Sequence, residues 1–148
     1  MFPLPAPMAQ ALAAARATAE GEVPVGAALV CDGEVIAVAA NAPRTLNDPT
    51  AHAEMRVIRD AARALGRERL DDCDLWVTME PCAMCAGAIA HARIRRLYYG
   101  ASDAKGGAVE HGPRFFGQPT CHHRPEVYPG IGEAAAAALL RAFFAARR

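Results

Sequence analysis

The stretch "DLWVTMEPCAMCAGAIAHARIRRLYYGA", residues 74–101, contains the strongest signals for the fold. Its first part, "DLWVTME" (74–80), is a compact apolar run typical of a buried strand. Pro81 ends that strand and can open the next helix, "CAMCAGAIAHAR". "RRLYYGA" (95–101) predicts another strand. A strand, a helix and a second strand in this order favour an α/β fold.

The segments before this stretch add a helix, a hairpin and a second helix. Residues 6–20 are rich in alanine and predict a first helix. In "PVGAALVCDGEVIAVAAN" (24–41), two apolar runs flank Asp32-Gly33, a strong hairpin signal. Asp48 and Pro49 suit a helix start, with aspartate as N-cap and proline at the first helical position. The helix expected over about 50–65, ending at Gly66, has apolar residues at helical spacing: Met55, Ile58, Ala62 and Leu65.

After the central stretch, glycines and prolines mark 102–121 as a long loop of the kind that often carries function. "EVYPGIG" is ambiguous, and 133–148 predicts a closing helix. The order of elements predicts a mixed sheet covered by helices. At 148 residues, the chain is expected to form one domain, 1–148, with a single core.

The hydropathy, charge and cysteine content of the chain limit its possible functions. The apolar runs are too short to span a bilayer, and the N-terminus lacks the pattern of a signal peptide, so we expect a cytoplasmic protein with no membrane partner. The charges of sixteen basic and sixteen acidic residues cancel, so the net charge does not indicate a nucleic-acid partner. The five cysteines are an odd number in a reducing compartment, which makes a disulfide framework unexpected.

Cys82 and Cys85 form a Cys-x-x-Cys pair that, at helical spacing, projects from one face and can bind one ion. The pair alone is equally compatible with a redox site or with two small buried residues. His52 adds a third possible ligand, although a single histidine is often structural. One histidine and two cysteines give zinc three protein ligands and an open fourth position, which is typical of a catalytic site. Water there ionises near neutral pH and becomes a nucleophile.

Glu54 lies two residues after His52 and can stand beside that water without binding the metal, moving a proton to a substrate nitrogen. A solvated carboxylate on a helix face is the simpler interpretation. The combined pattern H-x-E…P-C-x-x-C, however, is the known signature of hydrolytic zinc deaminases, which attack C4 of cytosine or C6 of adenine.

The chain resembles the bacterial tRNA adenosine deaminases, which convert the wobble adenosine of an anticodon loop to inosine. The resemblance extends over residues 8–148 and rests on "EVPVGAALV", "DPTAHAEM", "VTMEPCAMCAGAI", "ARIRRLYYGASDAKGGAV", "HHRPEVY" and "LLRAFFAARR". It implies a three-layer cytidine-deaminase-like α/β fold with a mixed five-stranded sheet flanked by helices. It also implies a homodimer, one zinc ion per subunit and an anticodon loop as substrate.

The resemblance assigns residues by position. His52, Cys82 and Cys85 would bind zinc, and Glu54 would be the proton shuttle. Asn41 would contact the purine, since an amide can both donate and accept, although by sequence alone an ordinary turn is the better interpretation. The backbone at Ala53 would help to hold the base.

Further assignments concern the RNA. Asp103 and Lys105 match a loop that meets the nucleotides beside the flipped base, where a carboxylate could accept a bond from a 2′-hydroxyl. Without the resemblance, Asp103 is simply an acidic loop residue. A C-terminal helix that borders the RNA is matched by Phe143, Phe144, Arg147 and Arg148. Adjacent phenylalanines cannot both face the core, so one is available for stacking or for a subunit contact, while at least one is expected to pack inside.

The segment "EHGPRFFGQPTCHHRPEVY" (110–128) departs from the family pattern, with His122 where an asparagine is expected. One alternative is therefore that Cys121, His122 or His123 supplies a fourth ligand and closes the metal site. Two other functions remain open. The protein could deaminate a free base or nucleoside, such as guanine, cytosine or cytidine, or it could be a zinc-stapled RNA-binding module without catalysis.

Overall fold

The computed structural model describes residues 3–147. Its elements are α1 (Ala6–Arg16), β1 (Gly26–Cys31), β2 (Glu34–Ala40), α2 (Ala53–Leu65), β3 (Cys73–Met79), α3 (Ala83–Ala92), β4 (Arg96–Ala101), the 3₁₀ helix η1 (Phe115–Gly117), β5 (Glu126–Tyr128) and α4 (Glu133–Ala145).

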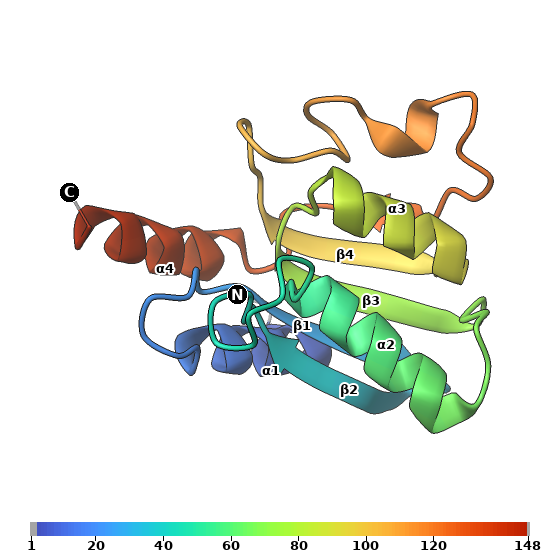
Figure 1. Ribbon diagram of the computed structural model, residues 1–148, viewed down its shortest axis with the longest axis horizontal. Coiled ribbons are helices and arrows are strands. Elements are labelled where there is room, and N and C mark those ends of the chain that lie inside the picture. The colour runs from blue at the N-terminus through green and yellow to red at the C-terminus, as the bar shows by residue number, and fades with distance from the viewer. Residues whose placement is uncertain (1–2, 148) are drawn as a thin grey trace.

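The five strands form one mixed sheet in the order β2-β1-β3-β4-β5. β1 pairs antiparallel with both β2 and β3, whereas β3, β4 and β5 run parallel. Helices α2 and α3 lie side by side on one face of the sheet, and α1 lies on the opposite face (Figure 1). α4 packs against β4 and α1. The α/β fold with a mixed five-stranded sheet between helices is therefore confirmed.

The predicted hairpin is present. Asp32 and Gly33 both have positive φ angles, 51° and 75°, and connect Cys31 to its partner Glu34. Two consecutive residues with φ above zero are the requirement of a type I′ turn, whose twist matches that of paired strands. Glycine is favoured at the second position because it adopts this conformation without steric cost.

The expected start of the second helix was wrong by a few residues. Asp48 does not cap a helix, because its carboxylate accepts hydrogen bonds from the backbone N–H and the hydroxyl of Thr50, at 2.8 and 2.7 Å. These bonds close a local turn that competes with the helix. The helix begins at Ala53, with His52 at the N-cap, and ends before Gly66 as predicted.

The strand–helix–strand stretch folds as predicted. β3 and β4 pair in parallel, and α3 lies between them along the chain. The expectation that Cys82 and Cys85 share one helical face was wrong in detail. Cys82 is the N-cap of α3, with φ −74° and ψ 177°, and only Cys85 is helical. Pro81 keeps the residue before it, Glu80, extended, and the helix begins only at Ala83, two residues after the proline. The helix packs through Ala86, Ile89 and Ala90, which are buried.

The terminal helices are shorter than predicted. α1 ends at Arg16 rather than at residue 20, because the chain turns where the Thr18 hydroxyl donates to the Ala15 carbonyl oxygen at 3.0 Å. α4 ends at Ala145, and residue 148 lies outside the described residues. The ambiguous segment after residue 125 begins with the short edge strand β5 and continues into the turn before α4.

The expectation of no disulfide was also wrong. Cys31 and Cys73 are joined by a disulfide, with their Cα atoms 4.5 Å apart. They occupy directly opposite positions on the antiparallel strands β1 and β3, where side chains approach most closely. The pairing depends on sheet register, which the spacing of cysteines along the chain does not reveal.

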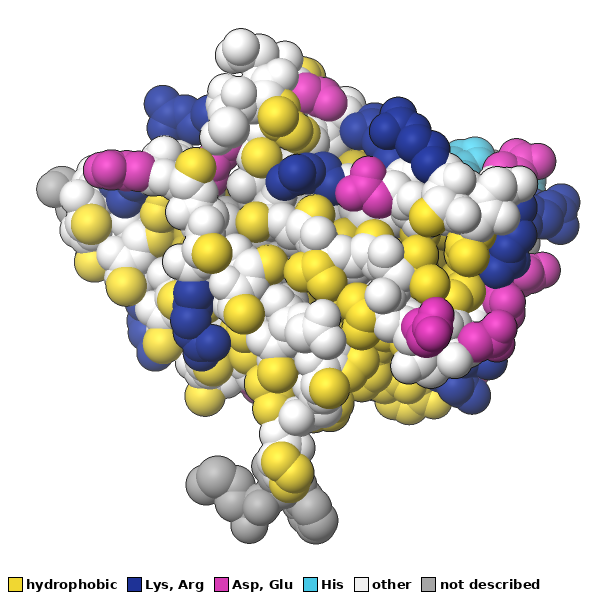
Figure 2. All heavy atoms as spheres, turned by 90° about the horizontal axis from the view of Figure 1, so that it is seen from below, with side chains coloured by type: hydrophobic (Ala, Val, Ile, Leu, Met, Phe, Trp, Pro, Cys, Tyr) yellow, Lys and Arg dark blue, Asp and Glu magenta, His cyan; other side chains and the backbone are white. Residues whose placement is uncertain are grey.

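The surface carries both signs of charge. On the face shown in Figure 2, Lys and Arg side chains are interspersed with Asp and Glu, in keeping with the cancelling totals of the sequence. Among the described residues, no helix has the length and apolar character needed to cross a bilayer.

Candidate active site

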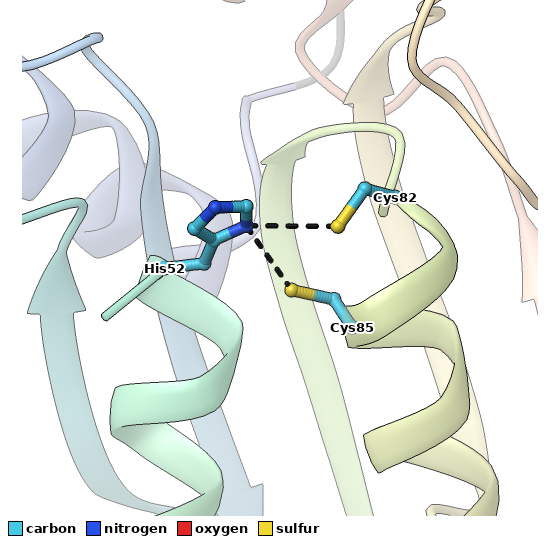
Figure 3. Close-up of side chains that lie close together, drawn as sticks. All are labelled: His52, Cys82 and Cys85. Atoms are coloured by element: carbon cyan, nitrogen blue, oxygen red, sulfur yellow. Dashed lines mark hydrogen bonds between the residues drawn. The ribbon is translucent and has the colours of Figure 1, made fainter. Parts of the chain in front are cut away.

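Two helix N-termini meet at the site. His52 precedes the first residue of α2, and Cys82 precedes the first residue of α3. Both caps have extended backbones, which turn their side chains out of the helices and toward each other. Cys85 lies in the first turn of α3 and completes the group. Figure 3 shows the two cysteine side chains pointing at the same ring nitrogen of His52.

The distances suit a metal ion. The Nδ1 atom of His52 lies 3.6 Å from the Sγ atom of Cys82 and 3.5 Å from that of Cys85. The three ligand atoms all lie within 4.8 Å of one another. Ligand atoms about 2.0–2.3 Å from a tetrahedral zinc ion are separated by about 3.5–3.8 Å, so this spacing needs little adjustment.

The chemistry of the group also suits a cation. The Cys85 thiol donates a hydrogen bond to the Cys82 sulfur. This bond, together with one to His52, lowers the pKa of Cys82 to about 4. The same bond, together with burial, raises the pKa of Cys85 well above its ordinary value. Without a metal, Cys85 therefore keeps its proton and shares it with the Cys82 thiolate, whereas a bound Zn²⁺ would compensate the charge of two thiolates. The donor set therefore fits zinc.

Glu54 lies beside this group and is almost completely buried, with 4% of its surface exposed. Burial, assisted by the nearby Cys82 sulfur, raises the pKa of its carboxyl above the ordinary value. A buried carboxyl group with a raised pKa can both accept and return a proton. The alternative of a solvated carboxylate on the helix surface is wrong.

A pocket of about 170 Å³ opens beside the candidate ligands. It is lined by Val23, Val25, Asn41, His52, Glu54, Met79, Glu80, Cys82 and Asp103. Two residues expected to touch the substrate, Asn41 and Asp103, are thus brought to the same cavity as Glu54. Ala53 is completely buried at the start of α2, and Lys105 is exposed on the loop after β4.

The C-terminal residues lie at a different place. Phe144 is 49% exposed and lines a separate pocket on α4 with Leu140 and Arg141. The Arg147 guanidinium packs over the Phe143 ring at 3.7 Å from its centre. Phe143 is half-buried, so the two adjacent phenylalanines do point to different environments. Arg148 lies outside the described residues.

The alternative of a fourth protein ligand from the 121–123 segment was wrong. Cys121 and His122 line a separate pocket near the C-terminal end of α3, together with Arg93. His123 contacts the carbonyl oxygen of Ile94 through Nε2 at 2.6 Å. The segment runs along the end of α3 opposite to Cys82, so these side chains are not among the three grouped ligand atoms.

Two buried carboxylates near the pocket were not identified from the sequence. Glu22 precedes β1 and is 2% exposed, and Glu80 follows β3 and is 3% exposed. Burial raises the pKa of Glu80, but N–H groups of Asp103, Glu110 and His111 outweigh it and hold the pKa below its ordinary value. For Glu80, the available signal was its place directly after the apolar strand β3, because an acidic residue is rarely buried unless it has partners.

The fold and the site define a class of protein, the deaminases that act through a His-Cys-Cys metal site. Residues 5–101 match the family model described as the cytidine and deoxycytidylate deaminase zinc-binding region. The chain is 62% identical over 142 residues to a tRNA-specific adenosine deaminase from Agrobacterium fabrum, covering 95% of this chain and 93% of the relative. It therefore belongs to the tRNA-specific adenosine deaminase family of these enzymes.

Solved structures agree with this assignment. One, from work on A-to-I editing by tRNA:A34 deaminases at the wobble position of transfer RNA, is 62% identical with a TM-score of 0.89, covering 90% of this chain and 98% of that one. A guanine deaminase from Nitrosomonas europaea is 26% identical with a TM-score of 0.76, covering 98% and 87%. The fold is thus shared with deaminases of free bases, whereas the high identity is with the tRNA enzymes.

Proposed function

We propose that this protein is a hydrolase that converts adenosine to inosine in tRNA, at the wobble position of the anticodon loop. The observation that carries this proposal is the buried Glu54 beside the His52–Cys82–Cys85 group, in a chain so similar to tRNA-specific adenosine deaminases. The overall reaction adds water at C6 of adenosine and releases ammonia. One domain formed by the whole chain would carry it out in the cytoplasm.

In this proposal, His52 supplies one nitrogen ligand and Cys82 and Cys85 supply two sulfur ligands to a single zinc ion. When bound, zinc supplies a Lewis acid that activates water for attack. The Glu54 carboxylate would take one proton from the attacking water and give it to the purine ring nitrogen. It would then move a second proton, from the hydroxyl added at C6, to the amine, which leaves as ammonia. Its burial supports this role, because water in bulk does not compete for the proton.

The pocket residues would hold the flipped base. Asn41 lines the cavity that Glu54 also lines, and its side-chain amide could both donate to and accept from the purine. The backbone at Ala53 would contribute a further contact. Asp103 and Lys105, on the loop after β4, would meet the flanking nucleotides, with Asp103 able to accept a bond from a 2′-hydroxyl.

The exposed ring of Phe144 and the guanidinium of Arg147 would extend the RNA surface along α4. A homodimer would supply the remaining RNA-binding surface. One subunit is small and neutral and carries interspersed charges, so it offers little basic surface for an anticodon stem. Base stacking on an aromatic side chain contributes about 1–3 kcal/mol per base, so a single phenylalanine has a measurable effect.

The test uses the zinc-loaded protein and an unmodified anticodon stem-loop of arginine tRNA with adenosine at the wobble position. Nucleoside mass spectrometry should detect one inosine per stem-loop, and none in a matched stem-loop with guanosine at that position. Guanine, cytosine and cytidine are assayed in parallel for ammonia release. Ammonia from one of them, with no inosine in RNA, would show that the substrate is a free base or nucleoside.

A further inference from the structure

We propose that Glu80 is a positioning residue for substrate binding: its buried carboxylate fixes the loop of residues 103–111 against the strand end that leads to Cys82. This inference rests on the proposed function, because it names the residue that holds the substrate-facing loop of that site. Glu80 is not assigned a contact with the substrate.

The carboxylate of Glu80 gathers donors from both ends of the loop. One oxygen, Oε1, accepts a hydrogen bond from the backbone N–H of Asp103 at 3.0 Å and lies 2.8 Å from Nδ1 of His111. The other oxygen, Oε2, accepts from the N–H groups of Val109, Glu110 and His111 at 3.2, 3.0 and 3.1 Å. One side chain thus ties the start of the loop to its end.

The donors are directed inward because the side chain is completely enclosed. The Glu80 side chain has no exposed surface, while its partner His111 is 38% exposed. A buried carboxylate is stable only when its oxygens are well supplied with hydrogen bonds, so the loop and the carboxylate depend on each other. Without the carboxylate, four backbone N–H groups would lose their acceptor.

Gly107 shows how closely the loop wraps around this group. A Cβ atom at Gly107 would lie 2.5 Å from Oε2 of Glu80 and 2.4 Å from the carbonyl oxygen of Asp103. Both distances are far inside van der Waals contact, so no larger residue fits while the loop keeps this path. The glycine is required by the approach of the backbone to the carboxylate.

The same contacts connect the loop to the candidate metal ligands. The N–H of Glu80 donates to the Ala101 carbonyl oxygen at 2.8 Å, and the N–H of Ala108 donates to the Pro81 carbonyl oxygen at 2.9 Å. Pro81 adjoins Cys82, and Asp103 lines the pocket with Cys82. Glu80 therefore sets the distance between the loop that would meet the nucleotides and Cys82, the candidate metal ligand that lines the same pocket.

Glu80→Gln tests the loop with a small change of shape. An amide offers one acceptor oxygen, so it can serve either the three N–H groups of 109–111 or the N–H of Asp103, but not both. Gly107→Ala approaches from the other side, because its methyl group pushes the loop off an intact carboxylate. Gly117→Ala is the matched control, since a Cβ there meets nothing within 4 Å.

Two measurements are made on the zinc-loaded proteins. Single-turnover deamination of the stem-loop, at increasing enzyme concentration, separates the half-saturating concentration from the maximal rate. For Glu80→Gln and Gly107→Ala we expect the half-saturating concentration to rise about tenfold or more, as for loss of a hydrogen bond to a charged group. The maximal rate should stay within about threefold of wild type. The zinc content should equal that of wild type, and Gly117→Ala should match wild type throughout.

Amide hydrogen exchange provides a readout that does not depend on activity. Peptides that cover 103–111 should exchange faster in both variants, while peptides from β1 and α2 should not change. An unchanged half-saturating concentration, a fall confined to the maximal rate, loss of zinc, or unaltered exchange at 103–111 would each overturn the inference. A wild-type protein that makes no inosine, yet shows the expected exchange pattern in the variants, would instead reject the proposed function.

Discussion

The carboxylate of Glu22 accepts hydrogen bonds from both the backbone N–H and the hydroxyl of Thr45, each at 2.8 Å, although 23 residues separate them. The N–H of Arg44 donates to the same carboxylate at 3.3 Å. The loop between Asn41 and His52 is thus fastened to the segment before β1. Since Asn41 and His52 both line the pocket, this fastening fixes one side of it.

The Glu22 contacts predict a pH-dependent contribution to stability. Burial raises the pKa of Glu22, but the bonds from Thr45 and Arg44 outweigh it, so the folded pKa lies below the unfolded value. The contribution is therefore complete above the unfolded pKa and is lost as the pH falls through the folded one. Near pH 7, Glu22→Gln should lower the free energy of unfolding by about 1–2 kcal/mol, by urea denaturation. The difference from wild type should shrink below about pH 4, and Glu20→Gln, an exposed neighbour, should have no effect.

Glu54→Gln should abolish turnover while leaving the site assembled. The amide keeps the shape of the side chain but cannot carry the proton, so the single-turnover rate should fall by at least about 100-fold. Zinc content and stem-loop affinity, measured by fluorescence anisotropy, should be unchanged. Asp60→Asn, on the exposed side of α2, is the control. A variant that retains most of its rate would refute the role of Glu54 as proton carrier.

Metal content should depend on Cys85 and not on Cys121. Cys85→Ala removes one of the three grouped ligand atoms, and a two-ligand site should lose zinc during dialysis against a weak chelator. Cys121→Ala changes a cysteine outside the group and should retain one zinc ion per chain. Atomic absorption spectroscopy gives both values. Equal zinc in the two variants would show that the metal, if bound, lies elsewhere.

The Cys31–Cys73 disulfide should contribute to thermal stability. It joins positions 42 residues apart, and closing a loop of this size in the unfolded chain stabilises the folded state by about 2–4 kcal/mol. Adding a phosphine reductant should therefore lower the melting temperature of the wild-type protein. The double variant Cys31→Ala/Cys73→Ala should melt at the same temperature with and without reductant. If the melting temperature of the wild-type protein did not change on addition of the reductant, this result would contradict the Cys31–Cys73 disulfide.

Phe144→Ala should weaken RNA binding without destabilising the fold. The ring is about half exposed, so its loss removes little buried area, whereas the loss of a stacking contact should raise the half-saturating stem-loop concentration about tenfold. The maximal rate should be unchanged because the side chain lies outside the Glu54 pocket. Val38→Ala, another exposed apolar residue, serves as the control. Normal binding by Phe144→Ala would place the RNA elsewhere.

Features with a local signal were predictable from the sequence. The turn at Asp32-Gly33 and the strand–helix–strand stretch depend on residues close together in the chain, and both are present. The grouping of His52, Cys82 and Cys85 could be inferred because zinc chemistry restricts the residue types and their spacing.

Features that depend on packing between distant segments were not predictable. Asp48-Pro49 is a valid local signal for a helix start, but Thr50 captures the aspartate and the helix begins only at Ala53. The pairing of Cys31 with Cys73 follows from the register of two strands. The role of Glu80 likewise needs the loop after β4 to fold back over the end of β3, which no local pattern encodes.

The candidate metal ligands lie at the starts of two separate helices, α2 and α3, and the strand β3 lies between these helices along the chain. This arrangement affects how the protein can acquire its metal. A short zinc-binding loop can trap an ion as soon as it leaves the ribosome. Here His52 and Cys85 meet only when strands from both halves of the chain have associated. We therefore expect zinc to bind only after these strands have associated, so that protein made without zinc should be inactive and should gain activity when zinc is added.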